Sequence, residues 1–401
     1  MMRLRCGALA LACAVVAAAP LTAQGSLSPV AGGSIAPAYQ HWSFGRGMFQ
    51  RSFVGGDSVE IESASQWTLP IAVSFPLGDA WTIDGTAAHA WGTVKLRGID
   101  PSLNTDRYQL DGLTDVRVGL SGRLLEDHLV FTASFNAATG KTELNEGELD
   151  ALRVLASPAL SFGIPSLGGG TGGSVGVVGA RQYGEWSVAA GASYELRGTY
   201  SPVTAFTVGA PSPDFRPGDA IHLSLGTSGA IGQSHTTLTL AADFFRDDKL
   251  TFGSAVRRTV DVQLGPVLSA DWQYLVGTTR LRELRFFIVD RYRTRYSQDG
   301  ASVAGTSGNY LDAGIHAVRA LSPSTGLSIE LTGRHQTGLS VDRSLTTAGV
   351  VGGGLGVGLM HDLGDFVLQP FVRAQYGRFD MKTTNVNGTA LGAGVTFGAR
   401  F

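Results

Sequence analysis

The sequence predicts an all-β protein, a transmembrane antiparallel β-barrel of about 16 strands. Three observations support this prediction. Apolar residues fall on every second position over many segments, the chain ends on an aromatic residue, and no run of 18 apolar residues follows the N-terminal leader. A secreted chain that enters a membrane without such a run must satisfy its backbone in a closed barrel.

The first 23 residues have the composition of a signal peptide. Two arginines precede a short apolar run, and small residues suit cleavage after Ala23. Cys6 and Cys13 both lie in this leader, so the mature protein is expected to hold no thiol for disulfides or metals. Lipid attachment at Cys13 is the alternative.

Composition supports a membrane barrel and argues against several other classes. Charged residues make up 16% of the chain, below the share of about 25% that is usual in soluble domains. The formal net charge is −2, which implies no nucleic-acid partner. We expect no cofactor and no metal. We expect residues 24–33 to form a periplasmic tail or plug, and residues 34–401 to form the barrel.

Alternation begins clearly at Trp67, where odd positions are apolar through Phe75. Trp81 and Trp91 then share one face, and ten residues of tilted strand between them span roughly 25 Å, the height of the apolar band. The same alternation recurs in residues 116–124, 129–135, 186–196, 238–244, 260–274, 284–288, 327–331 and 366–372. The first strand, 34–44, alternates poorly, and the count falls toward 14 if it is a plug or tail.

Short and long connections alternate along the chain. Tight links such as 77–79 and 232–234 lie between longer polar segments such as 98–111, 139–171, 201–218, 246–258 and 298–310. Short periplasmic turns and long outer loops follow this rule in membrane barrels. A soluble β-sandwich also alternates, but no composition shift marks a domain boundary here.

The last segment, Leu391–Phe401, is apolar on odd positions and carries Thr396 and Arg400 on the other face. A terminal aromatic residue suits a closing strand whose end lies at the membrane interface. We therefore expect location in the outer membrane, contact with its lipid, and recognition of Phe401 by the barrel-assembly machinery.

Arginines recur on the lumen-facing positions of the segment 280–296. The expected lumen set is Arg285, Arg291, Arg293, Arg295, Asp312, His316, Glu330, Arg334 and Arg373. One interpretation is a basic stripe along the path of anionic or polar solutes. The other, which we favour, is a structural ladder in which Asp312 and Glu330 pair with arginines on adjacent strands.

The longest loop, 139–171, contains a predicted short helix over 145–155, with a cap and acids in its first turn. It either folds into the pore as a constriction or lies outside as a lid. Candidate constriction residues are Glu146, Glu148, Asp150 and Arg153.

Glycines at alternate positions 352, 354, 356 and 358 leave one wall of the expected lumen without side chains. The loop, the N-terminal tail or arginine side chains could lie against them. The alternative, which we favour, is that these glycines relieve strain in a curved sheet.

Catalytic motifs are absent from the sequence: it has no GxSxG and no HExxH, and the eight histidines are scattered. We therefore predict no enzymatic activity.

The stretch Gly112–Leu125, with Asp115 and Arg123, and the turn Ala138–Lys141 resemble the outer-membrane family linked to the meta-pathway of phenol degradation. They are more loosely similar to the fatty-acid transporter-like barrels. That resemblance implies uptake of small hydrophobic or aromatic compounds, although Gly122 and Ala138 depart from the family pattern.

The sequence thus predicts an outer-membrane channel for small solutes. The alternative is a plugged, non-conducting structural or binding barrel. The sequence leaves the solute, the pore size and the choice between monomer and trimer open.

Overall fold

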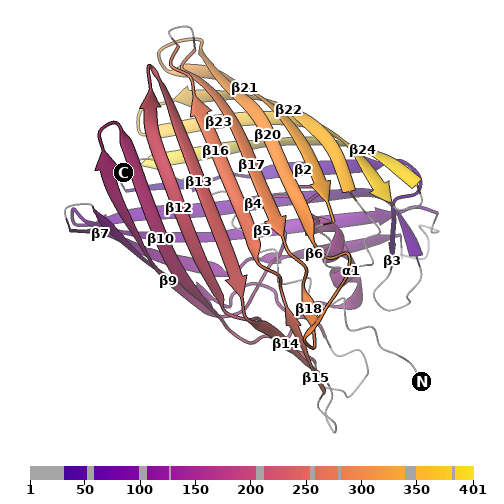
Figure 1. Cartoon of the computed structure of the whole chain (residues 1–401). Helices are drawn as coiled ribbons and strands as arrows, with labels where there is room; N and C mark the ends of the chain where they lie inside the picture. Colours follow the sequence, from indigo (N-terminus) through magenta and orange to yellow (C-terminus); the bar gives the residue numbers. More distant parts are fainter. Residues whose placement is uncertain are drawn as a thin grey trace.

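The computed structural model is a closed antiparallel barrel of 16 strands (Figure 1). The structure describes residues 31–51, 58–98, 106–125, 128–204, 212–252, 258–278, 281–338, 349–381 and 384–401. The predicted signal peptide and most of the predicted tail lie outside this part of the chain, so both stay predictions.

Two of the 16 barrel strands consist of two segments each. The strands are β1 Gly32–Ile35 with β2 Ala38–Phe44, β4 Ser58–Leu77, β5 Trp81–Leu96, β6 Arg107–Leu113 with β7 Val116–Leu124, β8 Leu129–Ala137, β9 Gly172–Tyr183, β10 Trp186–Arg197, β12 Ala220–Ile231, β13 Ser234–Phe245, β16 Val267–Leu275, β17 Glu283–Arg293, β20 Gly308–Ala320, β21 Thr325–Thr337, β22 Gly349–Asp362, β23 Phe366–Met381 and β24 Thr384–Arg400. The predicted fold class is confirmed, with short turns at one end and long loops at the other.

The first strand closes the barrel. Gly32 pairs with Arg400 and Ala38 with Gly394 of β24, while the other edge of β1 and β2 pairs with β4. The alternative count of 14 strands is therefore wrong. Alternation is poor here because Pro37, which lacks a backbone N–H, interrupts the strand. β1 also begins at Gly32, slightly before the expected barrel start at Ser34.

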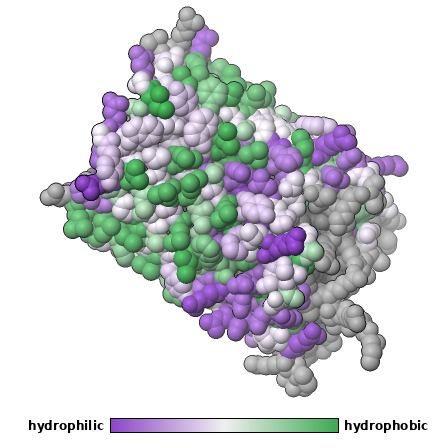
Figure 2. All heavy atoms as spheres, in the orientation of Figure 1, coloured by the Kyte–Doolittle hydropathy of each residue, from purple (hydrophilic) through white to green (hydrophobic). Residues whose placement is uncertain are grey.

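The outward face of the wall is apolar, as alternation predicted. Leu391 is 69% exposed on the last strand, and Trp67 and Trp91 form an exposed pair across β4 and β5. Figure 2 shows hydrophobic side chains over much of the wall and hydrophilic ones gathered toward the loop end. A closed barrel with an apolar outer face belongs in a bilayer, so the protein is an outer-membrane barrel.

Two outward glycines are covered by tryptophan rings from the paired strand. A Cβ at Gly122 would lie 2.4 Å from the Trp81 ring, and one at Gly229 would lie 2.4 Å from the Trp186 ring. Both tryptophans begin strands at the periplasmic turns. The glycines thus let interfacial aromatic rings lie flat against the wall, an arrangement known as aromatic rescue.

One predicted strand is wrong. Residues 260–274 alternate throughout, but they form two strands, β15 Arg258–Gln263 and β16, separated at Gly265–Pro266. Gly265 lies against backbone, because a Cβ there would be 2.4 Å from the Arg295 carbonyl oxygen. Pro266 has no N–H to continue the ladder. β15 leaves the barrel at this point.

β15 belongs to a small sheet in the outer loops that sequence alternation did not predict. Its strands are β11 Asp214–Arg216, β14 Asp247–Phe252, β15, β18 Ser297–Gln298 and β19 Ala301–Ser302. A further short strand, β3 Phe49–Arg51, pairs with the outer end of β4.

Asp248 is buried in the small sheet. Burial raises the pKa of its carboxyl group to about 6, although the Gly218 N–H donates to it at 2.7 Å.

The predicted helix is confirmed as α1, Glu146–Leu155. Asn145 caps it, and Glu148 completes a capping box by accepting the Asn145 backbone N–H at 3.0 Å. No helix in the described part of the chain is long and apolar enough to cross a membrane.

Candidate functional site

The loop between β8 and β9 lies inside the barrel. We call its residues 141–168, which include α1, the plug. Leu155 of α1 lies over the inward face of β5, where a Cβ on Gly92 would be 2.1 Å from its Cδ1 atom. Figure 1 shows α1 near the end of the barrel that carries β14, β15 and β18. The loop is therefore not an external lid.

An apolar core joins the plug to the inner wall at the outer end of the barrel. The core residues of the plug include Leu144, Leu149, Leu152, Val154, Leu155 and Leu160, and those of the wall include Trp42, Phe44, Ile61, Val94, Leu110, Val350, Phe379 and Val386. Complete burial of each large apolar side chain contributes about 1.5–3 kcal/mol. The interior of this half is thus packed like a domain core, which alternation could not indicate.

Polar wall side chains fix the irregular backbone of the plug. Gln66 of β4 both donates to the Ile164 carbonyl at 2.6 Å and accepts the Ile164 N–H at 3.1 Å. Gln40 and Trp42 of the first strand donate to the Leu160 carbonyl at 2.8 and 2.9 Å. These bonds satisfy backbone groups that would otherwise be buried without partners.

Arg334 of β21 anchors the plug from the other side. Its guanidinium donates to both carboxylate oxygens of Asp312 at 2.7 and 2.8 Å, and it lies 4.9 Å from the centroid of the Tyr310 ring. It also donates to Ser161 and, at 3.3 Å, to the Pro158 carbonyl. One bidentate ion pair therefore holds a cation in position to bind the plug backbone.

Asp115 closes the base of the loop. It lies between β6 and β7, and its carboxylate accepts the N–H groups of Gly140 at 2.8 Å and Gly169 at 2.7 Å. Asn136 donates to the same carboxylate at 3.1 Å. The two motif segments that carry the family resemblance, Gly112–Leu125 and Ala138–Lys141, thus meet here, where their role is to hold the two ends of the loop together.

The four constriction candidates lie in the plug, but they are not equivalent. Asp150 and Arg153 form a buried ion pair at 3.3 Å, and Gln50 of β3 donates to the Asp150 carbonyl at 3.1 Å. Glu148 binds Lys141 and the helix cap. Only Glu146 is exposed. Their effect on a passing solute stays a prediction.

The expected arginine stripe is shorter than the sequence suggested. Arg285, Arg291 and Arg293 lie on the inward face of β17, whereas Arg295 lies beyond the end of the strand and is exposed. The strand ends at Arg293, which donates to the Thr306 carbonyl at 3.4 Å, so the chain turns away from the barrel before Arg295.

Acids pair with several of the lumen-facing cations. Asp312 binds Arg334, and Glu283 lies 3.3 Å from Arg285 Nε and 3.1 Å from His316 Nδ1. The remaining pair, Glu330 and Arg373, lies at 3.1 Å on strands that are not neighbours. The Asp312–Arg334 pair therefore matches the ladder across adjacent strands that the sequence analysis favoured, whereas Glu330 pairs across an intervening strand. The role of these pairs in solute passage stays a prediction.

Gly356 explains how the Glu330–Arg373 pair forms. Glu330, Gly356 and Arg373 lie in register on β21, β22 and β23, so the ion pair crosses above the glycine. A Cβ at Gly356 would lie 3.6 Å from Glu330 Cβ and 4.0 Å from Arg373 Nε. An arginine side chain therefore does lie beside one glycine of this wall.

A polar cluster on β10, β12 and β13 was missed by sequence reasoning. His222 Nδ1 lies 2.8 Å from Asp243 and His222 Nε2 lies 3.2 Å from Glu195, which also accepts from Arg197 at 2.9 Å. The signal was present, because each residue is a charged or titratable side chain on the inward parity of consecutive strands. Strand pairing was needed to bring the residues together.

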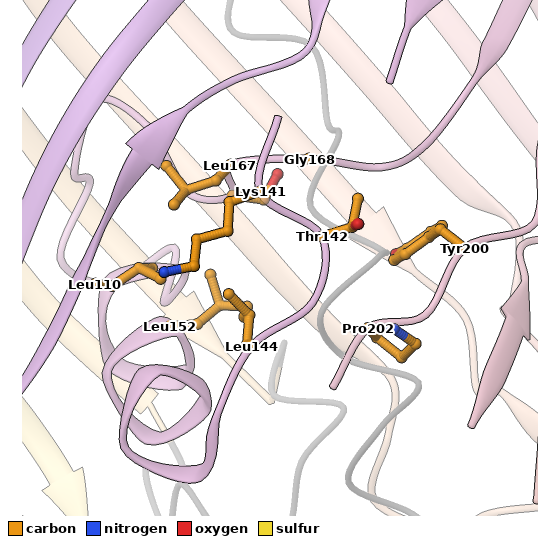
Figure 3. Close-up of a pocket in the computed structure, with 10 residues that line it drawn as sticks. Leu110, Lys141, Thr142, Leu144, Leu152, Leu167, Gly168, Tyr200 and Pro202 are labelled. Carbon is orange, nitrogen blue, oxygen red and sulfur yellow. The ribbon is translucent and has the colours of Figure 1, made fainter. Parts of the chain in front are cut away.

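A small crevice lies between the plug and the loop after β10 (Figure 3). Leu144, Leu152, Leu167 and Tyr200 line it beside Lys141. Its volume is about 10 Å³, room for about one water molecule, so in this conformation it holds no solute. The described residues contain no group of three or more His, Cys, Asp or Glu suited to a metal.

No family model and no curated protein sequence matches the chain. Solved structures with a similar course include a bacterial polysaccharide outer membrane secretin and a mutant of the TodX monoaromatic hydrocarbon channel. Both are 10% identical with a TM-score of 0.45; they match 93% and 94% of this chain and 99% and 92% of their own. An outer membrane channel from Pseudomonas putida F1 is 10% identical with a TM-score of 0.34, over 93% of this chain and 97% of its own. At these scores the similarity carries no argument about function.

Proposed function

We propose that this protein is an outer-membrane channel for small solutes, in which the plug narrows the outer half of the lumen. The observation that supports this most directly is the uneven filling of the interior. Inward side chains near the plug are buried, as at Trp42 and Gln66, each 3% exposed. Inward residues toward the periplasmic end, such as Phe371 and Arg373, remain exposed.

The plug lies against only part of the wall. Its hydrogen bonds to barrel strands are made with the first strand, β4, β6 and β21, and Asp115 holds its base. The first strand, β4 and β6 lie close together around the barrel, and β22, β23 and β24 separate them from β21. A barrel of 16 strands is wide enough to hold a water-filled lumen beside such a loop.

Conductance of the purified mature protein in planar bilayers tests the proposal. Discrete ion-conducting steps are expected from the full chain. A second variant replaces residues 142–167 with a short Gly-Ser linker, which is geometrically feasible because Gly140 and Gly169 bind the same carboxylate. Its steps are expected to be larger.

The alternative is a non-conducting structural or binding barrel. The packed apolar core between plug and wall favours it, since such cores resist local opening. A silent full chain together with a conducting plug deletion would establish this alternative. Silence of both forms, in correctly folded protein, would reject a channel altogether.

The resemblance implies a hydrophobic or aromatic solute for this channel. That finer assignment depends on the chemistry of the inner wall. Absence of enzymatic activity, assembly through Phe401 and the oligomeric state remain predictions. Phe401 itself is exposed, and its backbone N–H donates to the Ala31 carbonyl at 2.9 Å.

A further inference from the structure

The inner face of β10, β12, β13 and β16, which we call the open wall, is not fastened to the plug. All four strands are fully described, and no hydrogen bond joins them to the plug in the described part of the chain. In Figure 1 these strands run side by side along the near wall of the barrel. If the protein conducts, the space between the plug and this wall is a path that no hydrogen bond closes in the described part of the chain.

The polar cluster of the open wall lies level with the plug. Glu195, His222 and Asp243 each lie about nine residues from the periplasmic end of their strands, as does Arg334 on β21. At this level the side chains of His222 and Asp243 are 34% and 30% exposed, in contrast to the buried Trp42. Solvent therefore reaches the open wall beside the plug.

The open wall presents hydroxyl, amide and carboxylate groups. Its inward positions include Ser187, Ser193, Ser224, Ser228, Thr237, Thr239, Ser269, Asp271 and Gln273. From the periplasmic hairpins to the level of Glu195, no Phe, Tyr or Trp projects inward from these four strands. The large apolar side chains inside the barrel lie instead mostly in the core between the plug and the inner wall.

Most charges on the open wall are paired, and Asp271, which accepts from the Gln273 amide at 3.3 Å, leaves it slightly negative. Glu195 is 2.9 Å from Arg197, and His222 lies between Glu195 and Asp243. Such a surface attracts cations only weakly, but it offers many hydrogen bonds. A polar solute can exchange its water for these groups, whereas an apolar solute would displace water without replacing its hydrogen bonds.

We infer that the channel selects small polar solutes that carry hydroxyl or amine groups, and that the open wall is the surface that selects them. This inference rests on the proposed channel function and differs from the hydrophobic solutes that the resemblance implies. Ser224 and Thr239 are central, because they lie inward on β12 and β13, on the periplasmic side of the His222 cluster.

Swelling of liposomes that contain the full mature protein tests the inference, with arabinose as the probe. The double variant Ser224→Val/Thr239→Val removes two inward hydroxyls and is expected to slow arabinose entry about fivefold or more. The matched control is Thr227→Val, an outward hydroxyl on the same strand as Ser224, which is expected to leave entry unchanged. Folding of each variant is checked by the heat-dependent shift in gel mobility that folded membrane barrels show.

Two further measurements separate selection by hydrogen bonding from selection by charge and from selection of apolar solutes. Asp243→Asn keeps a hydrogen-bonding group, so arabinose entry is expected to stay within about twofold while the K⁺/Cl⁻ permeability ratio falls. Phenol at equal concentration is expected not to slow arabinose entry. Normal entry in the folded valine double variant, or inhibition by phenol, would overturn the inference. No arabinose entry together with no conductance in the unaltered protein would instead reject the channel function itself.

Discussion

Arg334→Ala is expected to release the plug from β21. The substitution removes a bidentate ion pair with Asp312 and the hydrogen bonds to Pro158 and Ser161. The ion pair lies within the wall, between β20 and β21, so the hydrogen bonds to Pro158 and Ser161, and not the ion pair, join Arg334 to the plug. A hydrogen bond that involves a charged group contributes about 1.5–3 kcal/mol. We take about 3 kcal/mol for these bonds together as the loss in plug docking, near the lower end of the range because Arg334 retains some solvent contact.

A loss of about 3 kcal/mol lowers the docking equilibrium roughly 100-fold. In planar bilayers the variant should therefore show long-lived, larger conductance steps about 100 times more often than the unaltered protein. Arg373→Ala is the matched control. It also removes an inward arginine paired with an acid, but that pair is more exposed and no hydrogen bond joins Arg373 to the plug in the described part of the chain.

The conservative variant Arg334→Lys keeps the charge but not the planar fork, so an intermediate frequency is expected. If the alanine variants at positions 334 and 373 open equally often, the plug is not held by Arg334 and the reasoning fails. The reasoning also fails if a folded Arg334→Ala variant shows larger conductance steps no more often than the unaltered protein.

Three other predictions follow from single positions. Asp115→Ala removes the acceptor shared by Gly140 and Gly169, so the loop should become cleavable by added protease while the barrel stays intact; a resistant loop would contradict this role. Leu391→Arg places a charge on the lipid face at a cost of about 2–4 kcal/mol and should reduce the folded fraction in refolding gels, unlike Thr396→Arg on the inward face. Asp248 has a folded pKa of about 6, above its usual value near 3.8, so the outer sheet binds a proton on folding. Its stability should then fall by at most about 3 kcal/mol as pH rises from about 4 to about 6, and hydrogen exchange should show this trend in the unaltered protein but not in Asp248→Asn.

Local sequence patterns determined most of the barrel. Alternation assigns each residue to the lipid or lumen face, because successive side chains of a strand point to opposite sides. Leu391 and Trp91 were placed outward in this way, and the capped helix at Asn145 was read from four consecutive residue types. These features depend only on neighbours in the chain.

Alternation gave a wrong prediction where the backbone leaves the barrel while the apolar period of two residues continues. Residues 260–274 alternate without a break, yet Gly265–Pro266 divides them between the outer sheet and the barrel. Alternation shows which face of a strand is apolar. It does not show to which sheet the strand belongs, because the strands of the barrel and of the outer sheet each have one apolar face.

The interior was decided by the tertiary structure. Contacts such as Leu155 with Gly92 and Arg334 with Ser161 join residues far apart in sequence, and they exist only once the wall has closed around the loop. The same holds for the cluster at His222, whose two partners, Glu195 and Asp243, lie on the strands to either side of it. A sequence fixes the face on which each side chain lies, but which side chains meet across an enclosed space depends on strand register and on the path of the loop between them.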